Sequence, residues 1–416
     1  MDKELLRQIN PVYLTAKQTI RGFAERGDED AIRIVDYLDK NAEKEQFMRE
    51  MDRDDPISRA FMSVPEFRFE LMNRIIDSTG ADNVLDMPCG YTVRGMRFAH
   101  SGRPYIGADL PAAIVDIDAA VRHLLTEEEQ EYVRYIPVDA TNQGSLEEAV
   151  AGIEGSVCIT TEGLLSYLTD SETEAVFDSI RQVLLKHGGC WVTPDREFRE
   201  YIGCVFKAVV NGDSELEHRV AETRAAIGKK ADSSLQSSSF FSSSLEESIA
   251  WAEARGFEIE RIPMSENMPD LVSLTPIREG IMDDLRRECR DLCVWKLTAV
   301  GKTGANVSLK QNTDREFYVT CSADGSRMTM KTGGRIDTLT APQIMEAFEE
   351  ACESGEIEDI LIDFEDLTYI SSAGLRVLLI IFKRLNGREH FKLINCNPEV
   401  KKIFETTGFA DIMLLW

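Results

Sequence analysis

Several features are missing from this 416-residue chain, and each absence narrows what it can be. No apolar run reaches the roughly 20 residues that a transmembrane helix needs; the longest is "LRVLLIIF". The first residues, "MDKELLRQIN", are charged and lack the apolar core of a signal peptide, so we expect a cytoplasmic protein with no membrane partner. The nine cysteines form no CxxC pair, which favours buried thiols in a reducing compartment over zinc or dithiol chemistry.

Basic residues and histidines are also scarce. The chain has 47 Lys and Arg against 73 Asp and Glu, a formal net charge of −26. Such a surface repels phosphate, so we expect no nucleic-acid partner. None of the five histidines falls at the end of a predicted strand, so the sequence offers no obvious general base: His100, His123, His187, His218 and His390.

The length of the chain predicts two domains, because 416 residues are too many for one ordinary core. Apolar residues at three- and four-residue steps predict helices in 29–51 and 65–80, so residues 1–82 are read as a helical cap. From Asn83 to residue 300, strands alternate with helices, which predicts an α/β fold with a mostly parallel sheet covered on both faces. A helical, serine-rich stretch at about 196–243 interrupts this rhythm and is read as a lid.

Residues 301–313, rich in Gly, Asn and Thr, are the predicted linker to a second, small α/β domain at 314–416. This domain begins with a predicted hairpin around Asp324-Gly325 and continues as alternating helices and strands.

Acidic residues mark the ends of successive strands in the first domain. The first strand leads into a glycine-containing turn, "VLDMPCGYT", and Asp109, Asp139 and Glu162 follow the next three strands. A carboxylate at the second position can accept hydrogen bonds from ribose hydroxyls, and one at the third can accept from an adenine amino group. Each acid alone is equally well explained as a helix cap or turn residue. Together they predict one ligand-binding rim.

The motifs "LDMPCGYTVRG", "YIGADLPAAI", "VDAT" and "TEGLLSYL" carry a resemblance over about residues 60–300. This region resembles class I S-adenosylmethionine-dependent methyltransferases, most closely the leucine carboxyl methyltransferase-like group with its polyketide-type O-methyltransferases. The resemblance implies a Rossmann-like, doubly wound sheet and S-adenosylmethionine as cofactor. Pro88 and Thr92 stand where the family has glycines, and the aspartate usual just before Arg94 is missing.

The resemblance also implies residue roles. The turn around Gly90 contacts the methionine part of the cofactor, Asp109 the ribose, Asp139 the adenine and Glu162 the methionine amino group. An arginine before the first strand holds the methionine carboxylate; Arg68 fits by spacing better than Arg59. The complete expected cofactor-binding set is Arg68, Met87, Pro88, Gly90, Asp109, Leu110, Asp139, Ala140, Glu162 and Gly163.

The acceptor side of this site is less defined. Methyl transfer from a sulfonium needs mainly alignment, and a carboxylate acceptor needs no base, whereas a hydroxyl acceptor does. The missing base therefore favours a carboxylate on a small molecule or protein over a hydroxyl. Tyr167 is the candidate catalytic residue that shapes the acceptor site, and packing under the lid explains it equally well.

In the second domain, "GRIDTLTAP", "IDFEDLTYISSAGLRVLL" and "NPEVKKIFETTGF" resemble the STAS domain of bacterial anti-sigma-factor antagonists over residues 314–416. The resemblance implies a small mixed sheet with helices on one face, an anti-sigma-factor or kinase-like protein partner, and a phosphorylatable serine at a helix start. That serine falls on Ser372, whose hydroxyl we expect to be exposed. Ser371 replaces the family's aspartate and is expected to cap the helix, and Gly374 to keep a partner surface close.

Two functions remain open. One is a methyltransferase coupled to a STAS regulatory or docking domain. The other is a signalling adaptor whose first domain is catalytically weak or inactive and whose output is the STAS contact. The altered glycine loop favours the adaptor, and the series of Asp109, Asp139 and Glu162 favours the enzyme.

Overall fold

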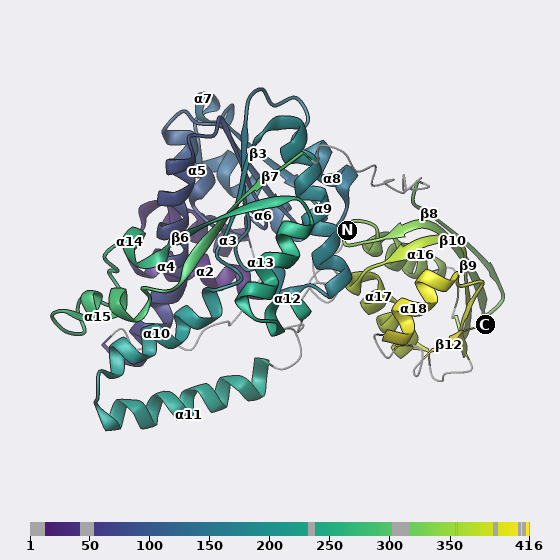
Figure 1. The fold of residues 1–416 in the computed structure, drawn as a ribbon. Coiled ribbons are helices and arrows are strands. Elements are labelled where there is room, and N and C mark those ends of the chain that lie inside the picture. The colour runs from purple at the N-terminus through teal and green to yellow at the C-terminus, as the bar shows by residue number, and fades with distance from the viewer. Residues whose placement is uncertain are drawn as a thin grey trace. The chain divides into compact units, whose positions relative to one another are not determined.

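The computed structural model describes residues 13–41, 54–231, 238–301, 316–353, 355, 357–385, 390–406, 409 and 413–415. Residues Leu14–Thr303 form one compact unit, and Gly304–Trp416 belong to a second. Figure 1 labels their elements, and each unit is described by itself. All but the first residue of the predicted linker, 301–313, lies outside the described residues.

The first unit is built on a seven-stranded sheet with the order β3-β2-β1-β4-β5-β7-β6. Strands β1 to β5 are parallel, and β7 runs antiparallel to both β5 and β6. This confirms the expected Rossmann-like, doubly wound sheet. The strand order reverses between β1 and β4, and open α/β sheets bind ligands outside the carboxyl ends of the strands at such a point. The strands are β1 (Asn83–Asp86), β2 (Tyr105–Asp109), β3 (Val133–Pro137), β4 (Val157–Thr160), β5 (Gly189–Thr193), β6 (Phe257–Pro263) and β7 (Cys293–Ala299).

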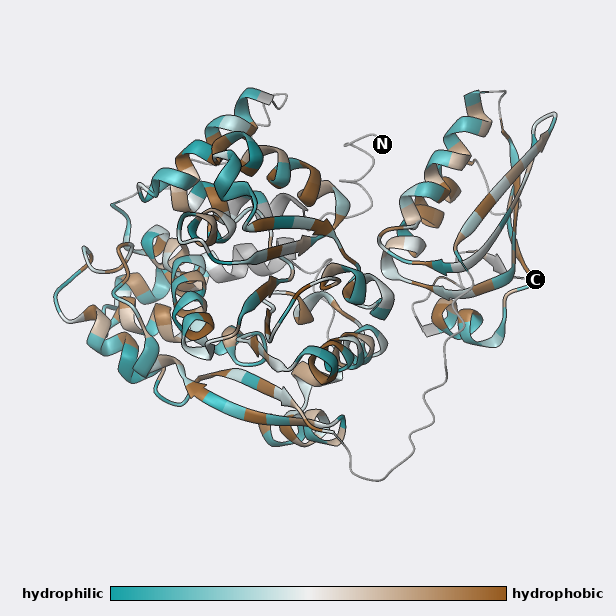
Figure 2. Ribbon diagram, turned by 90° about the horizontal axis from the view of Figure 1, so that it is seen from above, coloured by the Kyte–Doolittle hydropathy of each residue, from teal (hydrophilic) through white to brown (hydrophobic). Residues whose placement is uncertain are grey.

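Helices surround this sheet, and its strands bring Leu85, Ile159, Trp191 and Leu297 into a fully buried apolar core. Figure 2 shows brown, apolar stretches along the strands and teal on much of the surrounding helices. No helix in the described part of the chain is both long and apolar enough to cross a membrane. The helices are α2 (Tyr13–Glu25), α3 (Glu29–Asn41), α4 (Pro56–Thr79), α5 (Arg94–His100), α6 (Pro111–Leu124), α7 (Glu127–Gln130), α8 (Gln143–Ala149), α9 (Asp170–His187), α10 (Phe198–Val210), α11 (Ser214–Ala231), α12 (Ser239–Ser242), α13 (Leu245–Ala254), α14 (Met264–Asn267) and α15 (Ile281–Glu288).

Helix α4 begins nine residues earlier than predicted. Asp55 caps it by accepting a hydrogen bond from the Ser58 N–H at 2.9 Å, and Pro56 occupies the first turn, where its missing N–H has no helical partner to lose. Pro65, predicted to start the helix, lies inside it. The burial of apolar side chains on both sides of Pro65 offsets the lost backbone bond. The helix ends at Gly80, whose φ of 65° is left-handed, as its predicted C-cap role requires.

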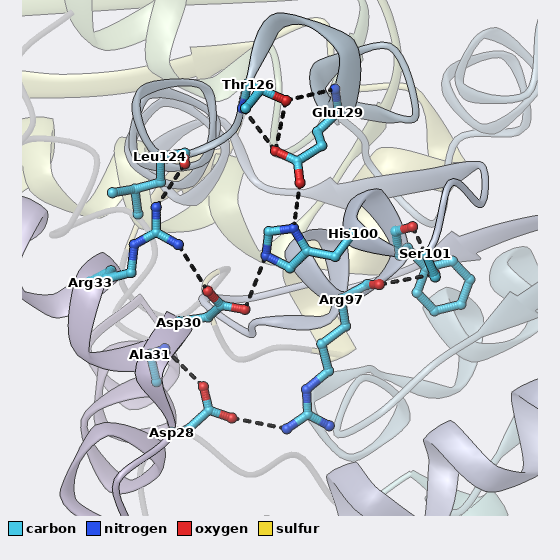
Figure 3. A network of polar contacts seen from close by, with 11 residues as sticks. Asp28, Asp30, Ala31, Arg33, Arg97, His100, Ser101, Leu124, Thr126 and Glu129 are labelled. Atoms are coloured by element: carbon cyan, nitrogen blue, oxygen red, sulfur yellow. Dashed lines mark hydrogen bonds and ion pairs between the residues drawn. The ribbon is translucent and has the colours of Figure 1, made fainter.

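Polar contacts fasten α3 to the rest of the unit, as Figure 3 shows. Asp28 accepts a hydrogen bond from Arg97 at 2.9 Å, and Asp30 lies 3.4 Å from Nε2 of His100. The other ring nitrogen of His100 lies 2.7 Å from Glu129. His100 therefore joins α3, α5 and α7 and has a structural role.

The stretch read as a lid is helical, as expected, and comprises α10, α11 and α12. Helix α10 packs against α4 through the stacked rings of Tyr201 and Phe67, whose centroids are 4.0 Å apart. Residues 232–237, in the serine-rich connection, lie outside the described residues, and the lid role stays a prediction.

The second unit has a five-stranded sheet with the order β12-β11-β10-β9-β8. Strands β8 and β9 form the predicted hairpin; Asp324 pairs with Arg327 across a turn of Gly325 and Ser326. The other neighbouring strands are parallel. The elements are β8 (Tyr318–Asp324), β9 (Arg327–Ile336), α16 (Ala341–Glu353), β10 (Asp359–Ile370), α17 (Ser372–Arg384), β11 (Phe391–Ile394), α18 (Pro398–Thr406) and β12 (Leu414–Leu415).

We predict that residues 314–416 fold on their own. Within the described residues, the buried apolar side chains of this unit form one cluster that runs from Met328 to Met413, with no member from the first unit. A fragment of residues 314–416 should therefore unfold in a single cooperative thermal transition, measured by circular dichroism. A fragment that aggregates without such a transition would show that the two units share a core.

Candidate active site

The carboxyl edge of the first sheet carries an acid after each of five parallel strands. Asp86 and Asp109 are the last residues of β1 and β2. Asp139, Glu162 and Asp195 each lie two residues beyond β3, β4 and β5. Because the carboxyl ends of parallel strands meet at one edge, the structure brings the three predicted acids to the same rim and adds Asp86 and Asp195. These two acids were not among the predicted site residues, although they follow the same pattern of an apolar strand and then an acid.

Asp109 fixes the turn after β1. Its Oδ2 accepts the Gly90 N–H at 2.7 Å, and its Oδ1 accepts the Leu110 N–H at 2.6 Å. Burial raises the pKa of Asp109 to about 6; the two N–H donors oppose this rise, and the nearby charge of Asp86 adds to it. A carboxylate has about four acceptor positions. Two are used by backbone N–H groups, so two remain for hydroxyl groups of a ligand.

The turn itself is held on both sides. The Met87 N–H donates to the Thr160 carbonyl, and the Cys89 N–H to the Ala108 carbonyl, each at 2.9 Å. The side chain of Met87 is buried, whereas Pro88 and Gly90 are partly exposed. The Met87–Pro88 peptide bond is cis, and Gly90 has a φ of 53°, a left-handed conformation that favours glycine.

Asp139 serves the turn after β3. Its Oδ1 accepts hydrogen bonds from the Thr141 N–H at 2.8 Å and from the Thr141 hydroxyl at 2.6 Å. Its own N–H donates to the Ser145 hydroxyl at 3.1 Å, and the residue is buried. Ala140 beside it is partly exposed. The turn role that the sequence left open for each acid is thus present at Asp139.

Glu162 belongs to a buried ionic cluster. The guanidinium of Arg94 donates to Asp86 and to Glu162 at 2.6 Å each, and to the Asn73 side-chain oxygen at 2.7 Å. Arg94 and Asp86 are each 1% exposed. Burial alone would lower the pKa of Arg94, but the two carboxylates raise it above its ordinary value. Burial raises the pKa of Glu162, with Arg94 and Arg68 opposing this shift.

Arg68, the arginine expected to hold the methionine carboxylate, lies beside Glu162. Its Nε is 3.6 Å from Glu162 Oε2, and its guanidinium lies over the Phe198 ring at 5.3 Å. A Cβ atom on Gly163 would lie 3.2 Å from Arg68 Nη1, and the φ of Gly163 is 76°, so glycine leaves room for the arginine. Arg59, the less favoured candidate, instead donates to the Ser273 carbonyl at 3.3 Å.

Asp195 organises the segment that follows β4. Its carboxylate accepts the N–H groups of Gly163, Leu164 and Leu165 at 2.6, 2.9 and 2.9 Å. Tyr167 is partly buried in the short helical turn Leu165–Tyr167. Burial raises the pKa of Tyr167; the positive charge of Arg68 opposes this shift, and the negative charge of Asp195 adds to it. Tyr167 therefore shares its surroundings with Arg68 and Asp195.

All five histidines lie in the described part of the chain, and none lies at this edge. His100 and His187 are the last residues of α5 and α9, and His123 is the second-last residue of α6. These helices run antiparallel to the strands and so end at the opposite edge of the sheet. His218 is on α11, and His390 is in the second unit. The carboxyl edge therefore has no imidazole among the described residues.

The two serines of the second unit have different roles. Ser371 is the N-cap of α17, and its hydroxyl accepts the Gly374 N–H at 3.4 Å, which confirms its predicted capping role. Ser372, expected to be exposed, is the first helical residue and is partly buried. The prediction for Gly374 was wrong. A Cβ there would lie 2.6 Å from Ile336 and from Ile370, so the glycine serves packing inside the domain rather than a partner surface.

Comparisons with known proteins treat the two units separately. Solved structures similar to the first unit include methyltransferases. The methyltransferase domain of bacterial CtHen1 is 10% identical, with a TM-score of 0.35, over 57% of this chain and 100% of its own. Magnesium protoporphyrin IX methyltransferase from Synechocystis is 8% identical, with a TM-score of 0.32, over 66% and 96%. We assign the fold of the first unit from its own strand order.

For the second unit, the family model described as STAS domain matches residues 319–416. An anti-sigma-B factor antagonist of Staphylococcus aureus is 26% identical over 109 residues, which are 26% of this chain and 91% of that protein. Apart from Tyr318, the first residue of β8, the sheet lies within the matched residues, and so do the helix that follows β10 and its capped N-terminus. Residues 319–416 are therefore a STAS domain.

Proposed function

We propose that this protein is an S-adenosylmethionine-dependent methyltransferase that transfers the methyl group to a carboxylate oxygen of a small molecule or protein. Its STAS domain docks a protein partner and couples that contact to the first unit. The observation that carries the proposal is Asp109: a carboxylate at the end of β2, bound to the glycine turn after β1 and with two acceptor positions left.

The residues of the edge fit the cofactor. Asp109 would accept the two ribose hydroxyls, and the partly exposed Pro88 and Gly90 leave the turn after β1 open to the methionine part. Asp139 and Ala140, one strand further along, would border the adenine. Met87, Leu110 and Gly163 would line the same site. When bound, S-adenosylmethionine supplies a methyl group already activated by its sulfonium.

Glu162 and Arg68 fit the amino-acid end of this ligand. They form an ion pair at 3.6 Å, longer than the 2.6 Å contact between Glu162 and Arg94. An ammonium group would give Glu162 a new partner, and a carboxylate would give Arg68 one, so the zwitterion can replace the longer pair. Arg94, fully buried and bound also to Asp86, keeps Glu162 in place during this exchange.

We infer the acceptor class from the missing imidazole. A hydroxyl acceptor must lose its proton, and no imidazole lies at the edge within the described residues. Tyr167, with its raised pKa, stays protonated at neutral pH and so supplies a hydrogen-bond donor rather than a base. A carboxylate acceptor is already deprotonated, and the Tyr167 hydroxyl would orient it.

A signalling adaptor is the second candidate function. It is favoured by Pro88 and Thr92, which stand where the resembled family has glycines, and by the STAS domain. The two candidates differ in cofactor binding, which the adaptor does not need.

The docking role of the STAS domain centres on Ser372. Its hydroxyl is at the first position of α17, and a phosphate there would be stabilised by the N-terminal end of the helix. The same charge, buried under a docked anti-sigma-factor-like or kinase-like partner, would be unfavourable. Phosphorylation would thus prevent docking without unfolding the domain.

Replacing Asp109 by alanine should weaken the binding of S-adenosylmethionine by about 1.5–3 kcal/mol, because hydrogen bonds to a charged group are lost. Isothermal titration calorimetry measures this difference. Glu128→Gln, a substitution on exposed helix α7, is the control and should bind as the parent does. An Asp109→Ala variant that is folded and binds as tightly as the parent would show that the ribose lies elsewhere.

The affinity should also depend on pH. The pKa of Asp109 in the free protein is about 6, and ligand hydroxyls favour its ionised form. Binding below this pKa must therefore displace a proton, and affinity should fall by about fivefold between pH 6 and pH 5, with a slope that approaches about tenfold per pH unit only further below the pKa. It should be nearly constant above pH 7. Titrations with Asp109→Asn should show a much flatter profile; a parent profile that is itself flat from pH 5 to 7 would contradict the role of Asp109.

The two serines of α17 should respond differently to substitution. Ser371→Ala removes the cap and should lower the free energy of unfolding by about 0.5–2 kcal/mol in urea. Ser372→Asp adds a charge that the helix N-terminus favours, so it should change this energy by less than about 1 kcal/mol. Incubation with ATP and a lysate of the source organism should place phosphate on Ser372. Phosphate found only at other residues would leave Ser372 without a switch role.

A further inference from the structure

Three consecutive charged residues follow β5, and all are buried: Asp195 is 6% exposed, Arg196 7% and Glu197 4%. Charged side chains are almost never this buried unless they are paired. Each of the three bonds to a different part of the first unit. They therefore fix several segments to one point at the end of β5.

Asp195 holds the segment after β4, where its two oxygens accept three successive backbone N–H groups, from Gly163 to Leu165. Gly163 turns the chain with a φ of 76°, which aims these N–H groups at the carboxylate. Glu162 lies directly before Gly163, and Tyr167 lies two residues after Leu165.

Arg196 and Glu197, the two residues after Asp195, bind segments of the first unit that lie outside the candidate site. Arg196 donates to the Ser248 hydroxyl at 2.8 Å and to the Ser243 carbonyl at 2.9 Å, at the start of α13. Glu197 accepts from the Trp295 ring N–H at 2.7 Å and from Arg261 at 2.9 and 2.7 Å, which joins β7 and β6. Glu197, like Asp195, is thus a buried carboxylate that accepts three hydrogen bonds from these groups, but its donors lie on β6 and β7.

We propose that Asp195 is a positioning residue of the methyltransferase site: by binding the N–H groups of residues 163–165, it sets where Glu162 and Tyr167 stand. The proposal rests on the proposed function, because those two residues are assigned there to cofactor and acceptor. Asp195 itself would contact neither the cofactor nor the acceptor.

The chemistry of the three bonds requires a carboxylate. Two oxygens offer enough acceptor positions for three N–H groups, whereas an asparagine has one acceptor oxygen and an amide NH₂. In Asp195→Asn, at least one backbone N–H would face another donor, and a buried donor without an acceptor is strongly unfavourable. The segment would then shift to find water or other acceptors. Glu162 and Tyr167 would move with it, although Arg94 still binds Glu162.

The test compares Asp195→Asn with Glu197→Gln in the full chain. Hydrogen exchange measured by mass spectrometry reports on residues 162–168, and calorimetry with S-adenosylhomocysteine reports on the site. Both variants should unfold at lower temperature than the parent. Only Asp195→Asn should accelerate exchange in 162–168 and weaken S-adenosylhomocysteine binding, by about tenfold or more for the loss of one charged hydrogen bond. Asp195→Glu, which keeps the carboxylate, should restore part of the affinity.

The outcomes separate the two hypotheses. A parent chain that does not bind S-adenosylhomocysteine overturns the proposed function, and the positioning role falls with it. A parent that binds, together with an Asp195→Asn variant that binds equally well, overturns the positioning role alone. Equal losses in Asp195→Asn and Glu197→Gln would show general destabilisation and would also overturn it.

Discussion

The candidate site depends on the ion pairs that the buried guanidinium of Arg94 forms with Asp86 and Glu162. A charge with 1% exposure must be neutralised within the protein, and here Asp86 and Glu162 do so at 2.6 Å each. Asp86 ends β1 and Glu162 follows β4, the two strands between which the sheet reverses its order. The two ion pairs therefore link the ends of β1 and β4, where the strand order reverses. Loss of one partner from a buried pair of this kind typically costs about 3–5 kcal/mol, which explains why the geometry at this point is fixed.

Around this cluster the edge is acidic, and protein N–H groups donate hydrogen bonds to two of its acids. Asp109 and Asp195 are bound by backbone N–H groups, and burial raises the pKa of both. Such groups favour a ligand that brings hydrogen-bond donors and positive charge, because these lower the energy of the ionised carboxylates. S-adenosylmethionine, with its sulfonium, ammonium and ribose hydroxyls, has this character. In the proposed function, Arg68 would bind the carboxylate of this ligand.

The sequence predicted those parts of the structure that depend on local pattern. The alternation of strands and helices predicted the sheet, and an acid after an apolar strand placed Asp109 and Glu162 at its edge. A polar residue before an apolar helix predicted the cap at Ser371. These features follow from backbone geometry and from side chains within a few residues of one another.

What the sequence did not predict depends on contacts between distant residues. Asp195 meets Gly163 across 32 positions, and Arg94 meets Glu162 across 68. Gly374 is needed because Ile336, far earlier in the chain, packs against it. The start of α4 was misplaced because Pro65 is the usual signal of a helix start, while packing on both sides of it overrides that signal.

In the proposed function, the carboxyl edge of β1 to β4 binds S-adenosylmethionine. A crystal structure of the full chain grown with S-adenosylhomocysteine tests this directly. We expect the nucleoside over the turn after β1, both ribose hydroxyls within hydrogen-bond distance of Asp109, and the amino-acid end between Glu162 and Arg68. A nucleoside bound elsewhere, or an edge that stays empty at saturating ligand while Arg68 and Glu162 remain paired, would contradict it.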